Sequence, residues 1–183
     1  MALVHYPVLN RKGETIASAI TNLDLHDLAR AARTYEIPAC FIVTPLKDQQ
    51  VLANRLLSHW CEGIGKELHS DREEALKRLR VVDSIEAAGS EIKADWGLSP
   101  TIWATSAREL PGALSHQEAR RRLSEAAQTA SPCLLLLGTG WGLAPSVIDE
   151  AEVVLESIRG LNGYNHLSVR CAAAIFLDRL MGE

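Results

Sequence analysis

Two glycine-rich segments near the C-terminus hold the residues best suited to bind a small ligand. One, GTGWGL (residues 138–143), follows four leucines at residues 134–137, and the other, GLNGYNHLSV (residues 160–169), follows a second apolar run at residues 153–158. Unbroken apolar runs are typical of parallel strands buried on both faces, and open α/β sheets bind their ligands at the carboxyl ends of such strands. The sequence therefore predicts that the two segments line one pocket.

The first segment differs from the common nucleotide-binding motifs. It lacks the Lys-Ser/Thr ending of a P-loop and the third-glycine spacing of a dinucleotide fingerprint, which argues against a triphosphate or NAD as the ligand. Glycines do let a backbone approach an adenosine or a ribose closely. The second segment adds Asn, Tyr, His and Ser, whose side chains can all donate hydrogen bonds to a ligand.

The elements that must position these loops alternate along the chain. Apolar runs predict strands at residues 3–9, 37–43, 80–82, 101–105, 134–137 and 153–158. Helical spacing predicts helices over residues 72–79, 117–129 and 167–180, and two more that begin near Asp24 and Ser84. Another helix contains residues 51–60 and is expected to end near Gly63 and Gly65. Asp24 and Ser168 are the expected caps of the first and the last helix. Repeated βα units predict an α/β fold with a mostly parallel sheet flanked by helices.

The composition is that of one folded domain. The 183 residues, 47% of them hydrophobic, suffice for a single compact domain over residues 1–183. No stretch approaches the roughly 18 apolar residues of a membrane span, and the N-terminus lacks the basic-then-apolar order of a signal peptide, so we expect a cytoplasmic protein with no membrane partner. The four cysteines are widely spaced without a CxxC pair, so we expect reduced, buried thiols and no metal site.

The net charge of −4 excludes a globally basic nucleic-acid binder and leaves room only for a local basic patch. Basic residues do cluster at residues 77–80 and 120–122. Because consecutive residues on a helix point in different directions, we interpret both clusters as solvated helix faces.

At the second glycine-rich segment the chain resembles the SPOUT class of S-adenosylmethionine-dependent RNA methyltransferases. It is most similar to the domain found alone or appended to bacterial tRNA (guanine-N1) methyltransferases. The resemblance covers nearly the whole chain and is carried by HYPV (5–8), TNLDLHDLAR (21–30), TY (34–35), TSAR (105–108), GTGWGLA (138–144) and YNHLSVR (164–170). It implies a C-terminal trefoil knot, a homodimer and an RNA substrate.

The resemblance also implies which residues bind S-adenosylmethionine. In the SPOUT class the last two loops wrap the methyl donor, and hydroxyls at the end of the strand over residues 101–105 lie on the same side. The donor-binding residues expected from this are Thr105, Ser106, Leu137, Gly138, Thr139, Gly140, Trp141, Gly142, Ile158, Gly160, Gly163, Tyr164, Asn165, His166, Leu167 and Ser168.

Candidate catalytic residues lie on the first helix. Ribose-methylating members of the class carry Asn-x-x-x-x-x-Arg, and residues 24–30 have that spacing with Asp24 in place of the Asn. Arg30 is too basic to be a free base, so we assign it to phosphate binding or to stabilisation of an oxyanion. Asp24 or Asp27 is the candidate acceptor of a proton from a base nitrogen, and a helix cap is the structural alternative for Asp24. The class usually places a glutamate where this chain has Thr139, Gly140 and Trp141, a second departure from a ribose target.

These observations favour S-adenosylmethionine-dependent methyl transfer to RNA, either tRNA or rRNA, with a base nitrogen or a ribose 2′-oxygen as acceptor. An alternative is a regulatory or RNA-binding module that binds S-adenosylmethionine or S-adenosylhomocysteine without transferring a methyl group. A third hypothesis, a metal-dependent hydrolase that uses His5, His26, Asp27 and His166, lacks a ligand pair at the i, i+4 spacing of a strong motif.

Overall fold

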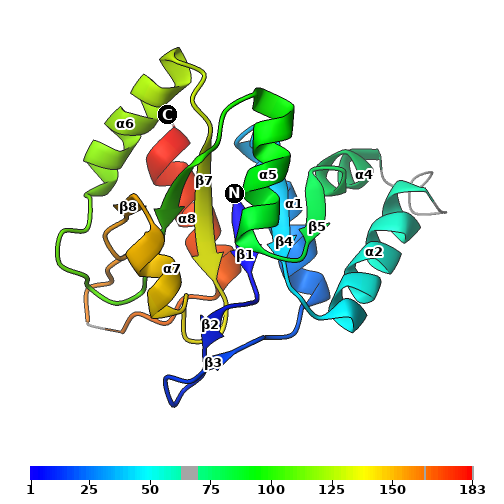
Figure 1. Ribbon diagram of the computed structural model, residues 1–183, viewed down its shortest axis with the longest axis horizontal. Helices are drawn as coiled ribbons and strands as arrows, with labels where there is room; N and C mark the ends of the chain where they lie inside the picture. The colour runs from blue at the N-terminus through cyan, green and yellow to red at the C-terminus, as the bar shows by residue number, and fades with distance from the viewer. Residues whose placement is uncertain (63–69, 163, 183) are drawn as a thin grey trace.

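The computed structural model describes residues 1–62, 70–162 and 164–182, and its centre is a six-stranded parallel sheet (Figure 1). The strand order is β5-β4-β1-β7-β6-β8, and a separate two-stranded antiparallel hairpin pairs β2 with β3. The strands are β1 (Ala2–Val4), β2 (Val8–Leu9), β3 (Thr15–Ile16), β4 (Cys40–Val43), β5 (Leu79–Val82), β6 (Thr101–Ala104), β7 (Cys133–Gly138) and β8 (Val153–Val154). The prediction of a parallel sheet is confirmed.

Helices cover both faces of the sheet. They are α1 (Asn22–Thr34), α2 (Lys47–Cys61), α4 (Ser70–Leu76), α5 (Ile85–Trp96), α6 (His116–Gln128), α7 (Pro145–Glu150) and α8 (Val169–Met181). The helices α5 and α7 lie on the face toward the viewer in Figure 1, and α1, α2, α4, α6 and α8 contribute to the core on the other face.

The strands alternate their side chains between two buried cores. In β1, Leu3 packs into the core beneath α1 and α8, whereas Ala2 and Val4 pack into the core beneath α5 and α7. All three are fully buried, as expected for a strand in the middle of a parallel sheet. Leu134 to Leu137 of β7 alternate in the same way, so the unbroken leucine run reflects two covered faces.

Several element boundaries differ from the prediction. The predicted strand over residues 3–9 is two strands, and the cis Tyr6-Pro7 peptide bond lies between them. The predicted strand over residues 153–158 is reduced to Val153–Val154, with an isolated bridge from Leu155 to Leu114. Helix α7 was not predicted, because its six residues are too few for a periodic pattern. The expected end of α2 near Gly63 and Gly65 lies outside the described residues.

The cap of α1 is a correction. Thr21, and not Asp24, is the N-cap: its hydroxyl oxygen accepts a hydrogen bond from the Asp24 amide at 3.1 Å. Asp24 stands at the third helical position and its carboxylate accepts a hydrogen bond from the Thr21 hydroxyl at 2.6 Å. The predicted cap of α8, Ser168, is confirmed, and Ser84, the predicted start of α5, is its N-cap.

Two further expectations concern the surface. Cys40 is buried and burial raises the pKa of its thiol to about 11, but Cys171 is exposed, so the expectation of buried thiols is wrong for Cys171. In the helices of the described part of the chain, no segment has both the length and the apolar character needed to cross a bilayer.

Candidate functional site

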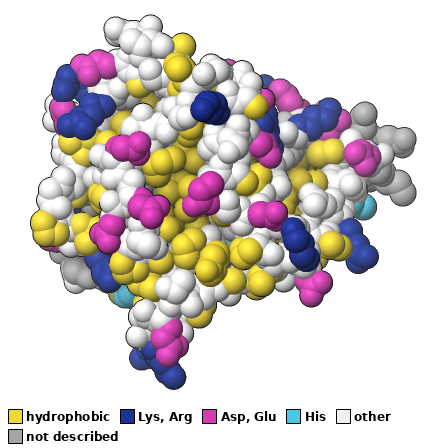
Figure 2. Space-filling view, in the orientation of Figure 1, with side chains coloured by type: hydrophobic (Ala, Val, Ile, Leu, Met, Phe, Trp, Pro, Cys, Tyr) yellow, Lys and Arg dark blue, Asp and Glu magenta, His cyan; other side chains and the backbone are white. Residues whose placement is uncertain are grey.

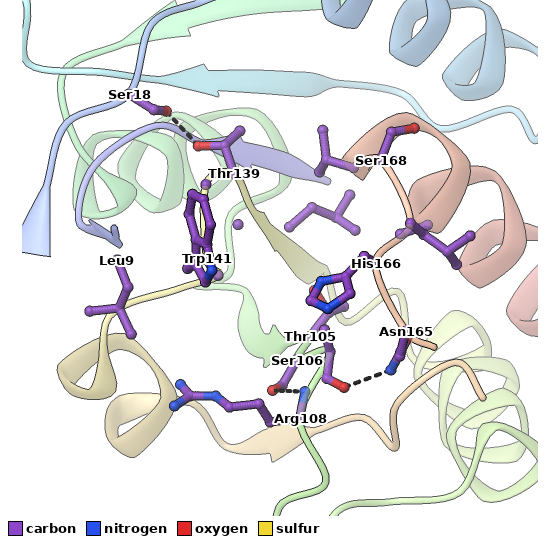
Figure 3. Close-up of a pocket in the computed structure, with 18 of the residues that line it drawn as sticks. Leu9, Ser18, Thr105, Ser106, Arg108, Thr139, Trp141, Asn165, His166 and Ser168 are labelled. Atoms are coloured by element: carbon purple, nitrogen blue, oxygen red, sulfur yellow. Dashed lines mark hydrogen bonds between the residues drawn. The ribbon is translucent and has the colours of Figure 1, made fainter. Parts of the chain in front are cut away.

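A cavity of about 910 Å³ opens at the carboxyl ends of β1, β6 and β7. The loop after β7 forms one wall and the segment before α8 forms the facing wall, with the loop after β6 between them (Figure 3). The β2–β3 hairpin and the segment between β3 and α1 complete its rim. The two glycine-rich segments thus meet at one cavity, to which the first contributes residues 138–142 and the second residues 165–169.

The loop after β7 is folded tightly upon itself and upon the hairpin. A Cβ on Gly138 would lie 2.5 Å from the backbone nitrogen of Leu143, and a Cβ on Gly140 would lie 2.7 Å from the carbonyl oxygen of Leu9. Gly140 also has a φ of 59°, in the left-handed region. Only glycine fits these two positions without a shift of the backbone.

A partly buried chain of hydrogen bonds connects this loop to β1 and to the segment before α1. The Thr139 hydroxyl donates to the carbonyl of Val4 at 3.0 Å and lies 2.5 Å from the hydroxyl of Ser18, which in turn lies 2.9 Å from Nδ1 of His5. His5 is fully buried. Burial lowers the pKa of His5 to about 4, against a smaller opposing effect of the Asp24 carboxylate, so the ring is neutral at neutral pH.

The segment before α8 is attached by fewer contacts. The Asn165 amide donates to the carbonyl of Ala107 at 2.7 Å, which connects this segment to the loop after β6. The Ser168 hydroxyl oxygen accepts from the Cys171 amide and caps α8. His166 lines the cavity and its ring contacts that of Tyr164 edge-on.

The two hydroxyls after β6 serve the backbone. The Thr105 hydroxyl donates to the carbonyl of Leu136 at 2.9 Å, and the Ser106 oxygen accepts from the Arg108 amide at 3.0 Å. Both residues line the cavity as predicted. Arg108, which also lines the cavity, extends its guanidinium toward the side of Leu9 and Trp141 (Figure 3).

Arg170 holds both candidate aspartates of α1. Its Nη1 lies 2.9 Å from Oδ1 of Asp24, and its Nε lies 3.2 Å from Oδ2 of Asp27. Asp24 lines the cavity and is buried, and Thr21 occupies its second carboxylate oxygen. Each carboxylate oxygen of Asp24 therefore already accepts one hydrogen bond, from Thr21 or from Arg170.

Arg30 lies outside the lining of the cavity, on the exposed side of α1. It is near His26, whose pKa is lowered first by burial and then by Arg72, with Arg30 acting in the same direction. The ring of His26 contacts Trp60 edge-on, and the Arg72 guanidinium stacks 4.6 Å over the Trp60 ring. Within one chain, Arg30 thus faces this cluster and is not part of the cavity.

Most of the predicted donor-binding residues line the cavity. They are Thr105, Ser106, Leu137, Gly138, Thr139, Gly140, Trp141, Gly142, Ile158, Asn165, His166, Leu167 and Ser168. Gly160 and Tyr164 are not among the lining residues. Gly163 lies outside the described residues.

The sequence did not indicate several residues of the site. Arg170, Ser18 and His5 come from segments far apart in the chain, and nothing in their local sequence predicts their contacts. Arg11 also lines the cavity, and the two adjacent cations Arg11 and Lys12 were the local signal that could have indicated it. Within the described ranges, no three His, Cys, Asp or Glu side chains are grouped so that they could hold a metal ion.

A family model described as "SAM-dependent RNA methyltransferase" matches residues 1–182. The chain belongs to this family. A curated relative, the tRNA (guanine-N(1)-)-methyltransferase of Oleidesulfovibrio alaskensis, is 44% identical over 182 residues, which cover 100% of this chain and 41% of the relative. The chain thus spans about two fifths of the length of that relative.

Solved structures of low identity share the fold. A probable methyltransferase from Bordetella pertussis superposes with a TM-score of 0.62 at 18% identity, over 98% of this chain and 90% of that one. The TrmH/SpoU tRNA modifying enzyme of Aquifex aeolicus gives a TM-score of 0.54 at 14% identity, over 90% and 70% of the two chains. The family member described here therefore has the fold of TrmH/SpoU-type, or SPOUT, methyltransferases.

The methyl donor of the family is S-adenosylmethionine, and the cavity suits a ligand of that kind. Its volume lies in the range of about 300 to 1,000 Å³ that is usual for small-molecule sites. Leu137, Ile158 and Phe176 supply apolar surface, and the glycine backbone of residues 138–142 supplies a wall that side chains would obstruct.

Proposed function

We propose that this chain transfers a methyl group from S-adenosylmethionine to RNA, with the donor held in the cavity between β6, β7 and α8. The observation that carries the proposal is the convergence of the two glycine-rich segments on one cavity at the carboxyl ends of parallel strands. The acceptor RNA is tRNA or rRNA, and the acceptor atom is a base nitrogen or a ribose 2′-oxygen.

The main task of the chain's own residues is to bind and orient the methyl donor and the acceptor RNA. The donor's sulfonium methyl is already electrophilic, so the protein mainly aligns donor and acceptor and removes a proton. The loop at residues 138–143 and Asn165 to Ser168 hold the donor. Asp24 and Asp27 remain the candidate proton acceptors and Arg30 the group that binds phosphate or an oxyanion. Gly160, Gly163 and Tyr164 remain predicted donor-binding residues.

We further propose a homodimer in which Arg30 serves the cavity of the partner subunit, because within its own chain it faces away from the cavity lining. Apolar surface near the cavity supports this: Leu23 is 61% exposed on the first turn of α1 and Leu167 is 46% exposed just before α8. The Arg170–Asp24 contact joins the starts of these two helices. The trefoil knot and a cytoplasmic location, which the family suggests, complete the proposal.

The first test is calorimetric titration of the protein with S-adenosylmethionine and S-adenosylhomocysteine, with ATP and NAD as controls. We expect S-adenosylmethionine and S-adenosylhomocysteine to bind with micromolar affinity, and ATP and NAD not to bind. Transfer of labelled methyl groups to total tRNA and rRNA follows, and mass spectrometry of the nucleosides identifies the acceptor. Donor binding without transfer would favour the binding module, and no binding would refute the proposal.

The role of Arg30 is tested by mixing two inactive variants. We expect Arg30→Ala to bind S-adenosylhomocysteine normally but to lose transfer by about 100-fold or more, as for loss of an oxyanion donor. Gly140→Val should lose donor binding. If Arg30 acts across the dimer, co-expression of the two variants restores part of the activity, because the mixed dimer has one intact site. No restoration in a verified mixed dimer would assign Arg30 to its own chain or to no catalytic role.

A further inference from the structure

The β2–β3 hairpin, residues 8–16, is a stiff arm that projects from the body of the molecule (Figures 1 and 2). Its turn is exposed, yet the Asn10 side-chain oxygen accepts from the amides of Lys12 at 2.8 Å and Glu14 at 3.0 Å. The Asn10 amide group also donates to the Glu14 carboxylate at 2.7 Å. Gly13 completes the turn with a φ of 81°. Such a self-bonded turn presents its remaining side chains at defined positions.

The base of the arm is bonded directly to the glycine-rich wall of the cavity. The Leu9 amide donates to the carbonyl of Gly142 and the Trp141 amide donates to the carbonyl of Leu9, both at 2.9 Å. The close approach of Leu9 to Gly140 leaves no room for a Cβ on that glycine. The tip of the arm therefore lies at a fixed offset from the loop that we propose holds the methyl donor.

The tip carries two cations, Arg11 and Lys12, and one carboxylate, Glu14. Arg11 and Lys12 are exposed, and neither is within salt-bridge distance of a carboxylate in the described part of the chain. Arg11 lines the mouth of the cavity together with Arg108, which is likewise without such a partner among those residues. The carboxylate that lines the cavity, Asp24, is engaged by Arg170. A chain with a net charge of −4 thus has a locally cationic cavity mouth.

An exposed aromatic ring accompanies these cations. Trp141 is 58% exposed and lies at the base of the arm, where its amide donates a hydrogen bond to the Leu9 carbonyl. Cations that track a sugar-phosphate backbone, with an aromatic side chain on which a base can stack, are typical of sites for single-stranded nucleic acid. Bound methyl donor would occupy the space between the loops, whereas Arg11 and Lys12 stand at the outer rim.

We propose that the arm is the RNA-binding element of the site. Arg11 and Lys12 bind backbone phosphates of an unpaired RNA segment, and Arg108 contacts the same segment from the loop after β6. The arm then places the acceptor nucleotide at a set distance from the donor loop. This inference rests on the proposed function for the identity of the polymer.

The test compares two variants with the same change in net charge. Arg11→Ala/Lys12→Ala removes the cations of the arm, and Arg121→Ala/Arg122→Ala removes an adjacent pair on α6, which lies at the opposite end of the molecule (Figure 1). Each is titrated with total tRNA and with an unstructured RNA oligomer at several salt concentrations, and with S-adenosylhomocysteine by calorimetry.

We expect the arm variant to bind RNA at least about 10-fold more weakly at low salt and to lose about 1 to 2 from the slope of log Kd against log salt, as expected for lost phosphate contacts. The α6 variant should bind RNA within about twofold of the unmodified protein. Both should bind S-adenosylhomocysteine normally. Glu14→Gln, which removes the negative charge beside the tip, should tighten RNA binding.

Three outcomes would overturn the inference. Equal loss of RNA affinity in both double variants would show non-specific attraction, loss of S-adenosylhomocysteine affinity would assign the arm cations to the donor, and absence of RNA binding by the unmodified protein would leave the arm without a ligand. RNA binding that depends on the arm, without methyl transfer, would retain the inference and refute only the proposed function.

Discussion

The two loops that meet at the cavity are held in different ways. The loop at residues 138–143 is bonded to Val4 and Leu9, and its Thr139 hydroxyl is hydrogen-bonded to Ser18. The facing segment leaves Leu161 fully exposed and Tyr164 69% exposed. One hydrogen bond, from the Asn165 amide to the Ala107 carbonyl, connects it to the loop after β6, and just before it Arg159 forms an exposed salt bridge with Glu109 at 3.2 Å. One wall is therefore built by contacts within the chain, whereas we expect the other to be stabilised further by the ligand or by a partner surface.

The largest effect that this comparison predicts is on the built wall. Gly140→Val puts a β-branched residue at a φ of 59° and its Cβ at 2.7 Å from the Leu9 carbonyl oxygen. We expect a loss of roughly 3 kcal/mol or more in the free energy of unfolding, together with loss of S-adenosylhomocysteine binding. Urea denaturation and calorimetry measure the two.

Gly97→Ala is the matched control. Gly97 ends α5 with a φ of 76°, but a Cβ there meets no atom within 4 Å. It should cost only about 1 kcal/mol of stability through backbone strain and leave donor binding unchanged. If Gly140→Val were no worse than this control, the close packing of arm and loop would have no energetic importance.

The first of these two walls was also the easier one to predict from the sequence. The leucines at residues 134–137 and the glycines after them indicated a buried strand and a ligand loop because both signals are local and strong. The arm was not predicted as a hairpin, since β2 and β3 have two residues each and so show no alternating pattern.

Contacts between distant segments were equally invisible. His5, Ser18 and Thr139 form one chain across the sheet edge, and Arg170 meets Asp24 from 146 positions away. Such pairs depend on the tertiary fold and leave no trace in local spacing. The assignment of Asp24 as a cap failed because α1 begins at Asn22, which makes Thr21 the N-cap and puts Asp24 in the first turn.

The second prediction, smaller in effect, concerns the support of the built wall and its dependence on pH. His5 has its pKa lowered from 6.5 to about 4 by burial, so in the folded protein it stays neutral where the unfolded chain takes up a proton. Stability is therefore full above pH 6.5 and falls as the pH drops toward 4. We expect His5 to account for a loss of about 2 kcal/mol between pH 7 and pH 5, seen by urea denaturation at each pH.

His5→Asn separates this contribution from that of other titrating groups. Asn can still bond the Ser18 hydroxyl but does not titrate, so the variant should show a flatter profile than the unmodified protein over this pH range. Donor binding should follow the same trend, because Ser18 connects His5 to Thr139 of the loop. Identical profiles for the two proteins would mean that folding does not lower the pKa of His5.

The smallest predicted effect is on the open wall. Asn165→Ala removes the hydrogen bond to the Ala107 carbonyl, which is 2.7 Å long and exposed. Because this segment contributes little to the stability of the fold, the free energy of unfolding should change by less than about 0.5 kcal/mol. Affinity for S-adenosylhomocysteine should fall by about fivefold, the equivalent of one modest hydrogen bond, as measured by calorimetry. A variant that lost stability and kept its affinity would reverse the comparison, since the open wall would then be part of the fold and not of the site.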